Sequence, residues 1–138
     1  MLLLQACNTS TPTGNQGNFI TGYITFVDSN FTQGGGRYTI ALYNFEFPPF
    51  ASKPAKTEYL RMEKKDLASY KIYWDGDRRF YIAVAWVSSE DTARKPLVLG
   101  TLGCDTNHHC GKHVLIYFPN YGSNYNFMSW ADTAQKLF

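Results

Sequence analysis

The sequence predicts an all-β protein built as an antiparallel sandwich of seven short strands. Aromatic residues make up 17% of the 138-residue chain, with ten Tyr and ten Phe, and such side chains favour strands. From residue 19 onwards, apolar residues alternate with polar ones over most segments, which is the period of a half-buried strand. Turn-forming residues interrupt the alternation about every ten residues, as they do in small sandwiches.

The first half of the chain contains three predicted strands. The first covers residues 20–27, where every second side chain is suited to a buried face. The second covers residues 38–45, after a loop with three consecutive glycines and before two consecutive prolines, which cannot donate to a ladder. A third, weaker strand is expected over residues 57–62, followed by a charged turn over residues 63–67.

The second half contains four more predicted strands. Over residues 70–74, apolar side chains alternate with Lys71 and Tyr73, which indicates that one face of this strand is exposed to solvent. Asp-Gly-Asp at 75–77 predicts a hairpin turn into the next strand, because Asp-Gly suits positive φ angles. Residues 79–88 are apolar on both faces, so we expect this strand to be central. Two shorter strands are expected over residues 96–102 and 114–118.

The period changes near the C-terminus. Apolar residues recur there with helical spacing, which predicts one stripe of a short amphipathic helix over about residues 126–138. The stripe comprises Phe127, Trp130, Ala131, Ala134 and Leu137 or Phe138. We expect this helix to cover one end or edge of the sheets.

The length and the net charge of the chain limit the classes of function that it can have. A chain of 138 residues is sufficient for one domain with a sizeable core. Thirteen Lys and Arg oppose eleven Asp and Glu, which gives a net charge of +2 without a basic run. We therefore expect no nucleic-acid partner.

The N-terminus contains a segment that resembles a targeting signal. The segment Leu4-Gln5-Ala6-Cys7 resembles the lipobox of bacterial lipoproteins, in which the cysteine is acylated and becomes the mature N-terminus. The resemblance implies a signal-peptide remnant over residues 1–6 and a lipid on Cys7. Residues 8–18 carry no charge and are typical of a flexible tether, which leaves residues 19–138 as a single domain. We therefore expect a protein of the bacterial cell envelope, bound to the membrane through its lipid on the periplasmic or cell-surface side.

Three segments suggest a family for the domain. The opening Thr-Gly-Tyr-Ile-Thr-Phe at 21–26 and the two aromatic strands at 70–74 and 80–86 resemble transthyretin-like domains of the carboxypeptidase-regulatory type. The resemblance covers about residues 20–103. It implies a seven-stranded prealbumin-like or immunoglobulin-like sandwich, and it implies no activity, because such domains mostly serve in binding or assembly.

One segment concentrates reactive side chains, and three interpretations of it stay open. Cys104 and Cys110 are the two cysteines that remain if Cys7 carries a lipid, and an oxidising compartment favours a disulfide between them. Alternatively, Cys104, His108, His109, Cys110 and His113 supply ligands for copper or zinc, since thiolate and imidazole suit both metals. The third interpretation is a polar loop with no ligand.

No catalytic motif is present in the sequence, so we expect a protein that is not an enzyme and has no cofactor. The expected activity is binding or assembly at the cell envelope, with a protein or carbohydrate ligand. Trp74, Tyr121 and Tyr125 are candidates for a recognition surface, because Tyr and Trp give contact area at low entropy cost; the alternative is that the aromatic residues fill the core. Two other hypotheses are a copper- or zinc-handling protein and a self-assembling subunit of a larger structure or filament.

Overall fold

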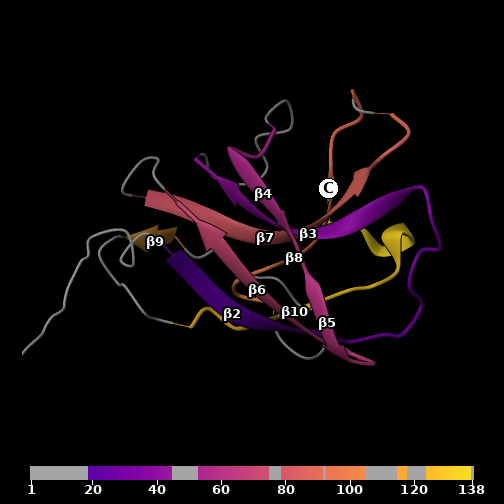
Figure 1. Cartoon of the computed structure of the whole chain (residues 1–138), viewed down its shortest axis with the longest axis horizontal. Helices are drawn as coiled ribbons and strands as arrows, with labels where there is room; N and C mark the ends of the chain where they lie inside the picture. The colour runs from indigo at the N-terminus through magenta and orange to yellow at the C-terminus, as the bar shows by residue number, and fades with distance from the viewer. Residues whose placement is uncertain are drawn as a thin grey trace, which may run out of the picture.

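The structure of the chain is a computed structural model, and it describes residues 19–44, 53–74, 79–91, 93–104, 115–117 and 124–137, with backbone alone for 115–117. Within these residues, the strands form two sheets (Figure 1). One sheet has the order β10-β2-β6-β5, formed by Phe127–Ser129, Phe19–Phe26, Leu67–Tyr73 and Arg61–Lys64. The other has the order β4-β3-β7-β8, formed by Lys56–Tyr59, Gly36–Tyr43, Arg79–Ser88 and Leu97–Thr101, and β9 (Leu115–Tyr117) pairs with β7. The prediction of an all-β protein is confirmed.

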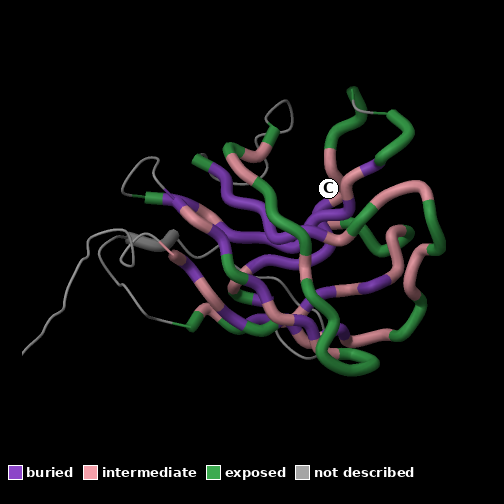
Figure 2. The backbone as a smooth tube through the Cα atoms, in the orientation of Figure 1, coloured by how far each residue is buried: buried purple, intermediate pink, exposed green. Residues whose placement is uncertain are grey.

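The core lies between the two sheets, which gives a sandwich-like arrangement (Figure 2). Every second side chain of β2 and β6 points into this core, as the alternation predicted. In β7, side chains on both faces are buried, because one face contributes Phe80, Ile82 and Val84 to the core and the other contributes Ala83 and Ala85 to a second hydrophobic cluster. β3 and β8 pair with its two edges. The prediction that residues 79–88 form a central strand is therefore confirmed. The buried core residues contributed by both sheets include Ile24, Ile40, Leu42, Ile72, Phe80, Ile82, Val84 and Leu99.

The expected strand over residues 57–62 is wrong in one respect, because the segment divides into two strands. It forms β4 in one sheet, crosses at Leu60 and continues as β5 in the other sheet. The Leu60 N–H donates to the Tyr38 carbonyl at 3.1 Å, and the Leu60 side chain packs against the core. Residues 63 and 64, expected in a turn, belong to β5, which pairs with β6. The segment has no regular alternation, since Tyr59 and Leu60 are both apolar, so the sequence did not mark the change of sheet.

Two further predictions about the strands are wrong. β6 and β7 lie in different sheets, so they do not form the predicted hairpin. The described residues alone contain nine strands, whereas seven were expected. The additional strands arise from the division at Leu60 and from the C-terminal segment, where a helix was expected.

The predicted C-terminal helix is wrong within the described residues. Residues 127–129 form β10, which pairs parallel with β2, and only a 3-10 turn, η2 (Thr133–Gln135), follows. Phe127, Ser129 and Ala131 are buried, so the period that places side chains in the core is two. Gly100 permits this path, because a Cβ at its position would lie 2.6 Å from the Met128 carbonyl oxygen. Pairing with β2 and packing against β8 therefore override the helical spacing.

The C-terminal segment links the two sheets. β10 adds to the first sheet, while the N–H groups of Trp130 and Leu137 donate to the Leu99 and Val98 carbonyls of β8 in the second, at 3.1 and 2.8 Å. The Asp28 carboxylate accepts from the backbone N–H of Ala131 at 2.5 Å and from that of Asp132 at 3.1 Å. The segment thus satisfies polar groups on both sheets, which stabilises their arrangement.

No helix among the described residues has the length and apolar character needed to cross a membrane.

Candidate binding groove

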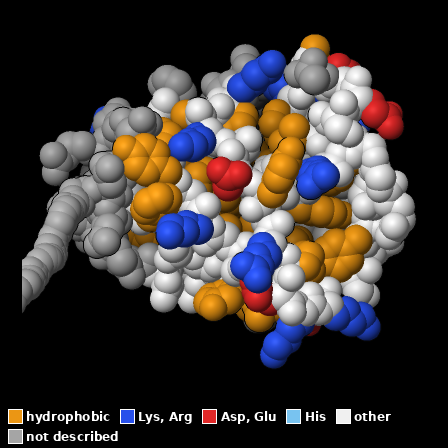
Figure 3. All heavy atoms as spheres, viewed as in Figure 1, with side chains coloured by type: hydrophobic (Ala, Val, Ile, Leu, Met, Phe, Trp, Pro, Cys, Tyr) orange, Lys and Arg blue, Asp and Glu red, His pale blue; other side chains and the backbone are white. Residues whose placement is uncertain are grey.

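A groove of about 510 Å³ opens beside the point where the chain crosses between the sheets. It lies between β3 and β4 of one sheet and β5 of the other, on the face shown in Figure 3. The residues that line it are Phe31, Thr32, Gly36, Arg37, Tyr38, Tyr59, Leu60, Met62, Lys64 and Lys65. We refer to this feature as the β3–β5 groove.

Aromatic packing builds the inner wall of the β3–β5 groove. The rings of Phe31 and Tyr38 meet edge to face with centroids 5.6 Å apart. Both rings also contact Phe26, at 5.0 Å from Phe31 and 5.8 Å from Tyr38, and Phe26 belongs to the core. Edge-to-face packing at these distances is favourable beyond the area that it buries. The groove is therefore continuous with the hydrophobic core.

The hydroxyl of Tyr38 is held from two sides. It donates to the Ala131 carbonyl at 2.5 Å and accepts from the Thr32 N–H at 2.7 Å. The Thr32 hydroxyl in turn lies 2.9 Å from the Thr133 hydroxyl. These bonds fix the Tyr38 ring against the C-terminal segment, so one wall of the groove is formed before any partner arrives.

Two large apolar side chains are exposed at the groove. Tyr59 on β4 is 60% exposed and Met62 on β5 is 47% exposed. Among the described residues, the other large hydrophobic side chain with comparable exposure is Tyr23, at 48%, and it does not line the groove. Exposed apolar side chains that gather in a concave site are typical of binding surfaces.

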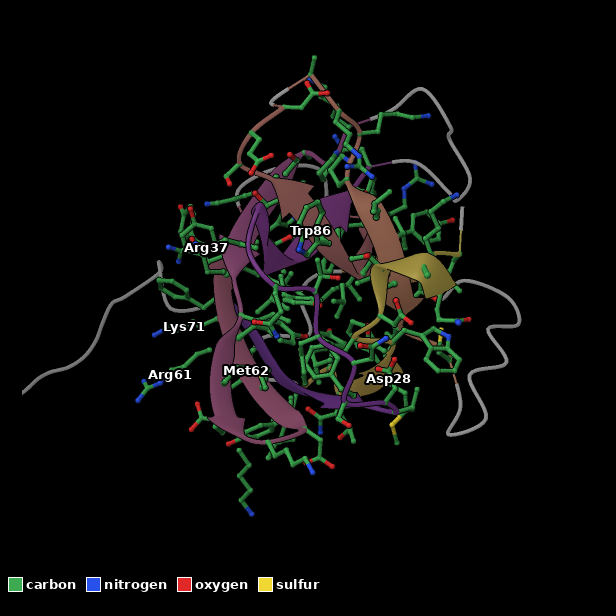
Figure 4. All side chains as sticks on the ribbon, turned by 90° about the vertical axis from the view of Figure 1, so that its right-hand side faces the viewer. Asp28, Arg37, Arg61, Met62, Lys71 and Trp86 are labelled. Carbon is green, nitrogen blue, oxygen red and sulfur yellow. The ribbon has the colours of Figure 1, made fainter. Side chains whose placement is uncertain are left out.

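The charge of the groove is positive. Arg37, Lys64 and Lys65 line it, and no lining residue is acidic. Residues 53–71, which include β4 and β5, carry six Lys or Arg but only three Asp or Glu, although the whole chain has thirteen and eleven. Figure 4 shows Arg37, Arg61 and Lys71 on one side of the molecule, with Asp28 on the other. Although the net charge of the whole chain is small, the groove and the strands β4 and β5 beside it therefore have a local excess of positive charge.

Cations and aromatic rings are paired across this face. The Arg37 guanidinium lies over the Tyr59 ring, 4.7 Å from its centroid. Beyond the groove, the Lys56 ammonium lies 4.9 Å from the centroid of Tyr73, and the Lys71 ammonium 4.3 Å from that of Phe19. A cation over an aromatic face stabilises an exposed pair by about 0.5–1 kcal/mol.

The structure places two of the three predicted recognition residues, and it places them apart from the groove. Trp74 is 3% exposed and packs against Phe80, with ring centroids 5.8 Å apart. The expectation that Trp74 presents a surface is wrong, because its ring fills the core. Tyr125 is half-buried, and its carbonyl accepts from the Tyr70 hydroxyl at 2.7 Å. Burial, with Tyr125 nearby, raises the pKa of that hydroxyl. Tyr121 lies outside the described residues.

The Cys/His segment lies largely outside the described residues, as does Cys7. Cys104 is buried, and its sulfur lies 3.2 Å from the Thr101 backbone N–H, which donates to it. Cys104 is disulfide-bonded, with its partner sulfur outside the described residues. Pairing with Cys110 therefore stays a prediction, and so does a metal site involving His108, His109 and His113. Among the described residues, no group of three or more His, Cys, Asp or Glu is arranged to hold a metal ion.

Sequence reasoning missed the β3–β5 groove. Its signal in the sequence was the mixture of apolar and charged side chains over residues 59–64 of a weak predicted strand, most of which the structure exposes. Nothing in the sequence indicated that Arg37 would lie beside Tyr59, because that contact depends on the pairing of β3 with β4.

The chain matches no family model, no curated protein and no solved structure with which it was compared.

Proposed function

We propose that this chain is a non-catalytic binding module of the bacterial cell envelope and that the β3–β5 groove is its binding surface. The observation that carries the proposal is the composition of the groove. It joins the exposed side chains of Tyr59 and Met62 to three cations over a wall fixed by Tyr38. A preformed concave site with apolar contacts and a few convergent polar groups is the usual form of a binding site.

The strand order supports the immunoglobulin-like alternative for the fold. In that fold, sheets of order ABED and C′CFG face each other. The observed order corresponds to it with β2, β6 and β5 as strands B, E and D, and with β4, β3, β7 and β8 as C′, C, F and G. The C-terminal β10 then takes the edge position of strand A. Sandwiches of this kind often serve in recognition, which agrees with a binding role.

The lipobox-like segment supports attachment to the membrane. A lipid on Cys7 would leave the uncharged residues 8–18 between the anchor and β2. A flexible chain of that length spans on the order of 20 Å, which keeps the domain close to the bilayer. Growth of the host with radiolabelled palmitate tests this step: the chain should incorporate label, and Cys7→Ser should abolish the incorporation. Equal labelling of both proteins would contradict it.

Site-specific photo-crosslinking in the native host tests the groove as the binding surface. A photoreactive benzoyl-phenylalanine replaces either Tyr59 in the groove or Tyr23 outside it, which are 60% and 48% exposed. The proposal expects a discrete adduct from position 59 and none from position 23. An adduct from position 23 alone, or no adduct from position 59, would contradict it. The similar exposure of the two tyrosines makes each the control for the other.

A further inference from the structure

We propose that the β3–β5 groove binds an extended acidic segment of another polypeptide, which adds as a strand to the open edge of β5. This inference rests on the proposed binding function and specifies the partner. The partner would pair its backbone with β5 and direct every second side chain into the groove. Strand addition of this kind takes affinity from main-chain hydrogen bonds and specificity from the side-chain contacts.

The position of β5 provides the first argument. β5 is the outermost strand of its sheet, and no described strand pairs with its other edge. All four residues of β5 are exposed. An edge strand presents a row of backbone N–H and C=O groups that another chain can pair with. Charged side chains such as those of β5 discourage indiscriminate pairing, so a partner needs complementary charge.

The alternation of β5 provides the second argument. Met62 and Lys64 line the groove, and Arg61 and Glu63 do not. The Glu63 carboxylate lies 3.5 Å from the Arg61 guanidinium and accepts from the Ser69 hydroxyl at 2.5 Å. Glu63 is therefore engaged away from the groove, and it leaves the charge of Lys64 uncompensated there. The pairing of β5 with β6 shifts register between Met62 and Lys64, and both side chains still line the groove. The groove face of β5 thus offers one apolar and one cationic contact.

Charge complementarity identifies the partner's side chains. With Arg37, Lys64 and Lys65 in the lining and no carboxylate among the lining residues, the groove favours an anion. The apolar surfaces of Tyr59 and Met62 favour an aliphatic side chain between two acidic ones. The tether of this chain, residues 8–18, carries no charge and does not meet this requirement.

The strand edge favours a polypeptide over other anions. An anionic glycan or a lipid headgroup would satisfy the cations, but neither supplies N–H and C=O groups at the repeat of a β-strand, which is about 3.3 Å per residue. The unpaired edge belongs to β5, and two of its four residues, Met62 and Lys64, line the cationic groove. An extended acidic peptide satisfies both features at once.

Fluorescence anisotropy with a synthetic peptide tests the proposal. The probe is a fluorescein-labelled peptide of sequence Glu-Thr-Val-Thr-Glu-Thr-Val-Thr-Glu, which places acidic and apolar side chains on one face of a strand. The 138-residue chain should bind it in saturable fashion. The double variant Lys64→Glu/Lys65→Glu should lose at least about tenfold in affinity. Lys53→Glu/Lys95→Glu, a matched double reversal at exposed lysines outside the groove, should stay within about twofold.

Backbone methylation separates strand addition from charge attraction. Two further probes carry N-methyl groups on all threonines or on all glutamates and valines, so each blocks one edge of the peptide. Strand addition predicts that one probe loses at least about tenfold in affinity and the other binds nearly as well as the parent. Equal affinities of all three probes would overturn the proposal, because the attraction would then be charge alone.

Two other anions complete the test. Polygalacturonate represents an acidic glycan, and vesicles of phosphatidylglycerol represent an anionic membrane. Binding of either one through Lys64 and Lys65, with no binding of the peptide, would overturn the choice of partner while leaving the groove as a binding surface. Failure of the crosslink from position 59 would instead overturn the proposed function itself. Concentration-dependent association of the chain with itself through β5, in place of peptide binding, would also contradict this inference.

Discussion

The guanidinium of Arg37 lies over the ring of Tyr59, 4.7 Å from its centroid, at the rim of the β3–β5 groove. Arg37 belongs to β3 and Tyr59 to β4, and the two strands pair with Tyr59 opposite Thr39. Because the ring is 60% exposed, one cation and one apolar surface are available together to a partner. This pair connects the fold to the proposed function, since the pairing of two strands creates the rim.

Removing the Tyr59 ring should weaken peptide binding. In Tyr59→Ala, the partner loses an apolar contact and Arg37 loses the ring that orients it, so affinity should fall about three- to tenfold. Tyr59→Phe keeps the ring and should bind almost as well as the parent. The measurement is anisotropy with the Glu/Thr/Val peptide. Tyr23→Ala removes an exposed tyrosine outside the groove, and an equal loss there would show that the effect is not specific to the site.

Removing the Asp28 carboxylate should destabilise the domain. Asp28 accepts from the N–H groups of Ala131 and Asp132, and Asp28→Ala leaves both donors without this partner. The free energy of unfolding should fall by about 1–3 kcal/mol. Urea denaturation measures the change. Asp66→Ala, at an exposed turn, should change the value by less than about 0.5 kcal/mol, and a similar loss in both variants would contradict the role given to Asp28.

The stability of the domain should fall at alkaline pH, and Tyr43 should cause part of the fall. Burial raises the pKa of Tyr43 from 10.0 to about 12. Below about pH 10 both folded and unfolded chains hold this proton, so Tyr43 adds no pH dependence. Between pH 10 and about 12 the unfolded chain releases the proton and the folded chain retains it, so the free energy of unfolding falls as pH rises.

The variant Tyr43→Phe isolates that contribution. The difference in slope between parent and variant should approach about 1.4 kcal/mol per pH unit between pH 10 and 12, and should vanish below pH 9. Denaturation at a series of pH values gives the slopes. Identical slopes for the two proteins would show that Tyr43 ionises in the folded chain as readily as in the unfolded one.

The thiol state of the chain tests the interpretation of its Cys/His segment. We expect the protein made in an oxidising compartment to be lighter by two hydrogens, with a peptide map that joins Cys104 to Cys110. A disulfide sulfur is not a thiolate ligand, so no stoichiometric copper or zinc should remain. Native mass spectrometry reports both properties. A bound metal that is lost in the triple variant His108→Ala/His109→Ala/His113→Ala would instead favour the metal-binding hypothesis.

The sequence predicted the strands whose burial follows from local alternation. β2, β6 and the central β7 lie close to the residue ranges expected for them. In each strand, the apolar side chains that the sequence pattern assigned to a buried face are buried. The sequence did not predict which sheet each strand joins. The chain changes sheets at Leu60 within a segment that has no regular alternation, so no local pattern marks the change of partner strand.

The C-terminal segment shows why the local spacing of apolar residues led to a wrong prediction of a helix. Phe127 and Ala131 fit both a helical stripe and a strand with period two, and the sequence alone does not distinguish them. The free edge of β2 and the close approach allowed by Gly100 decide the outcome, and both are tertiary features. The groove was missed for the same reason, since its lining residues come from separate segments that meet only in the folded chain.

Amide chemical-shift mapping tests the central claim that the β3–β5 groove is the binding surface. The 138-residue chain, labelled with ¹⁵N, is titrated with the unlabelled Glu/Thr/Val peptide. The account predicts that the largest shifts fall on Arg61–Lys64 and Gly36–Tyr38, and that the amide of Tyr23 is unaffected. Shifts centred on β2 or spread evenly over the surface, or the absence of shifts in β5, would contradict it.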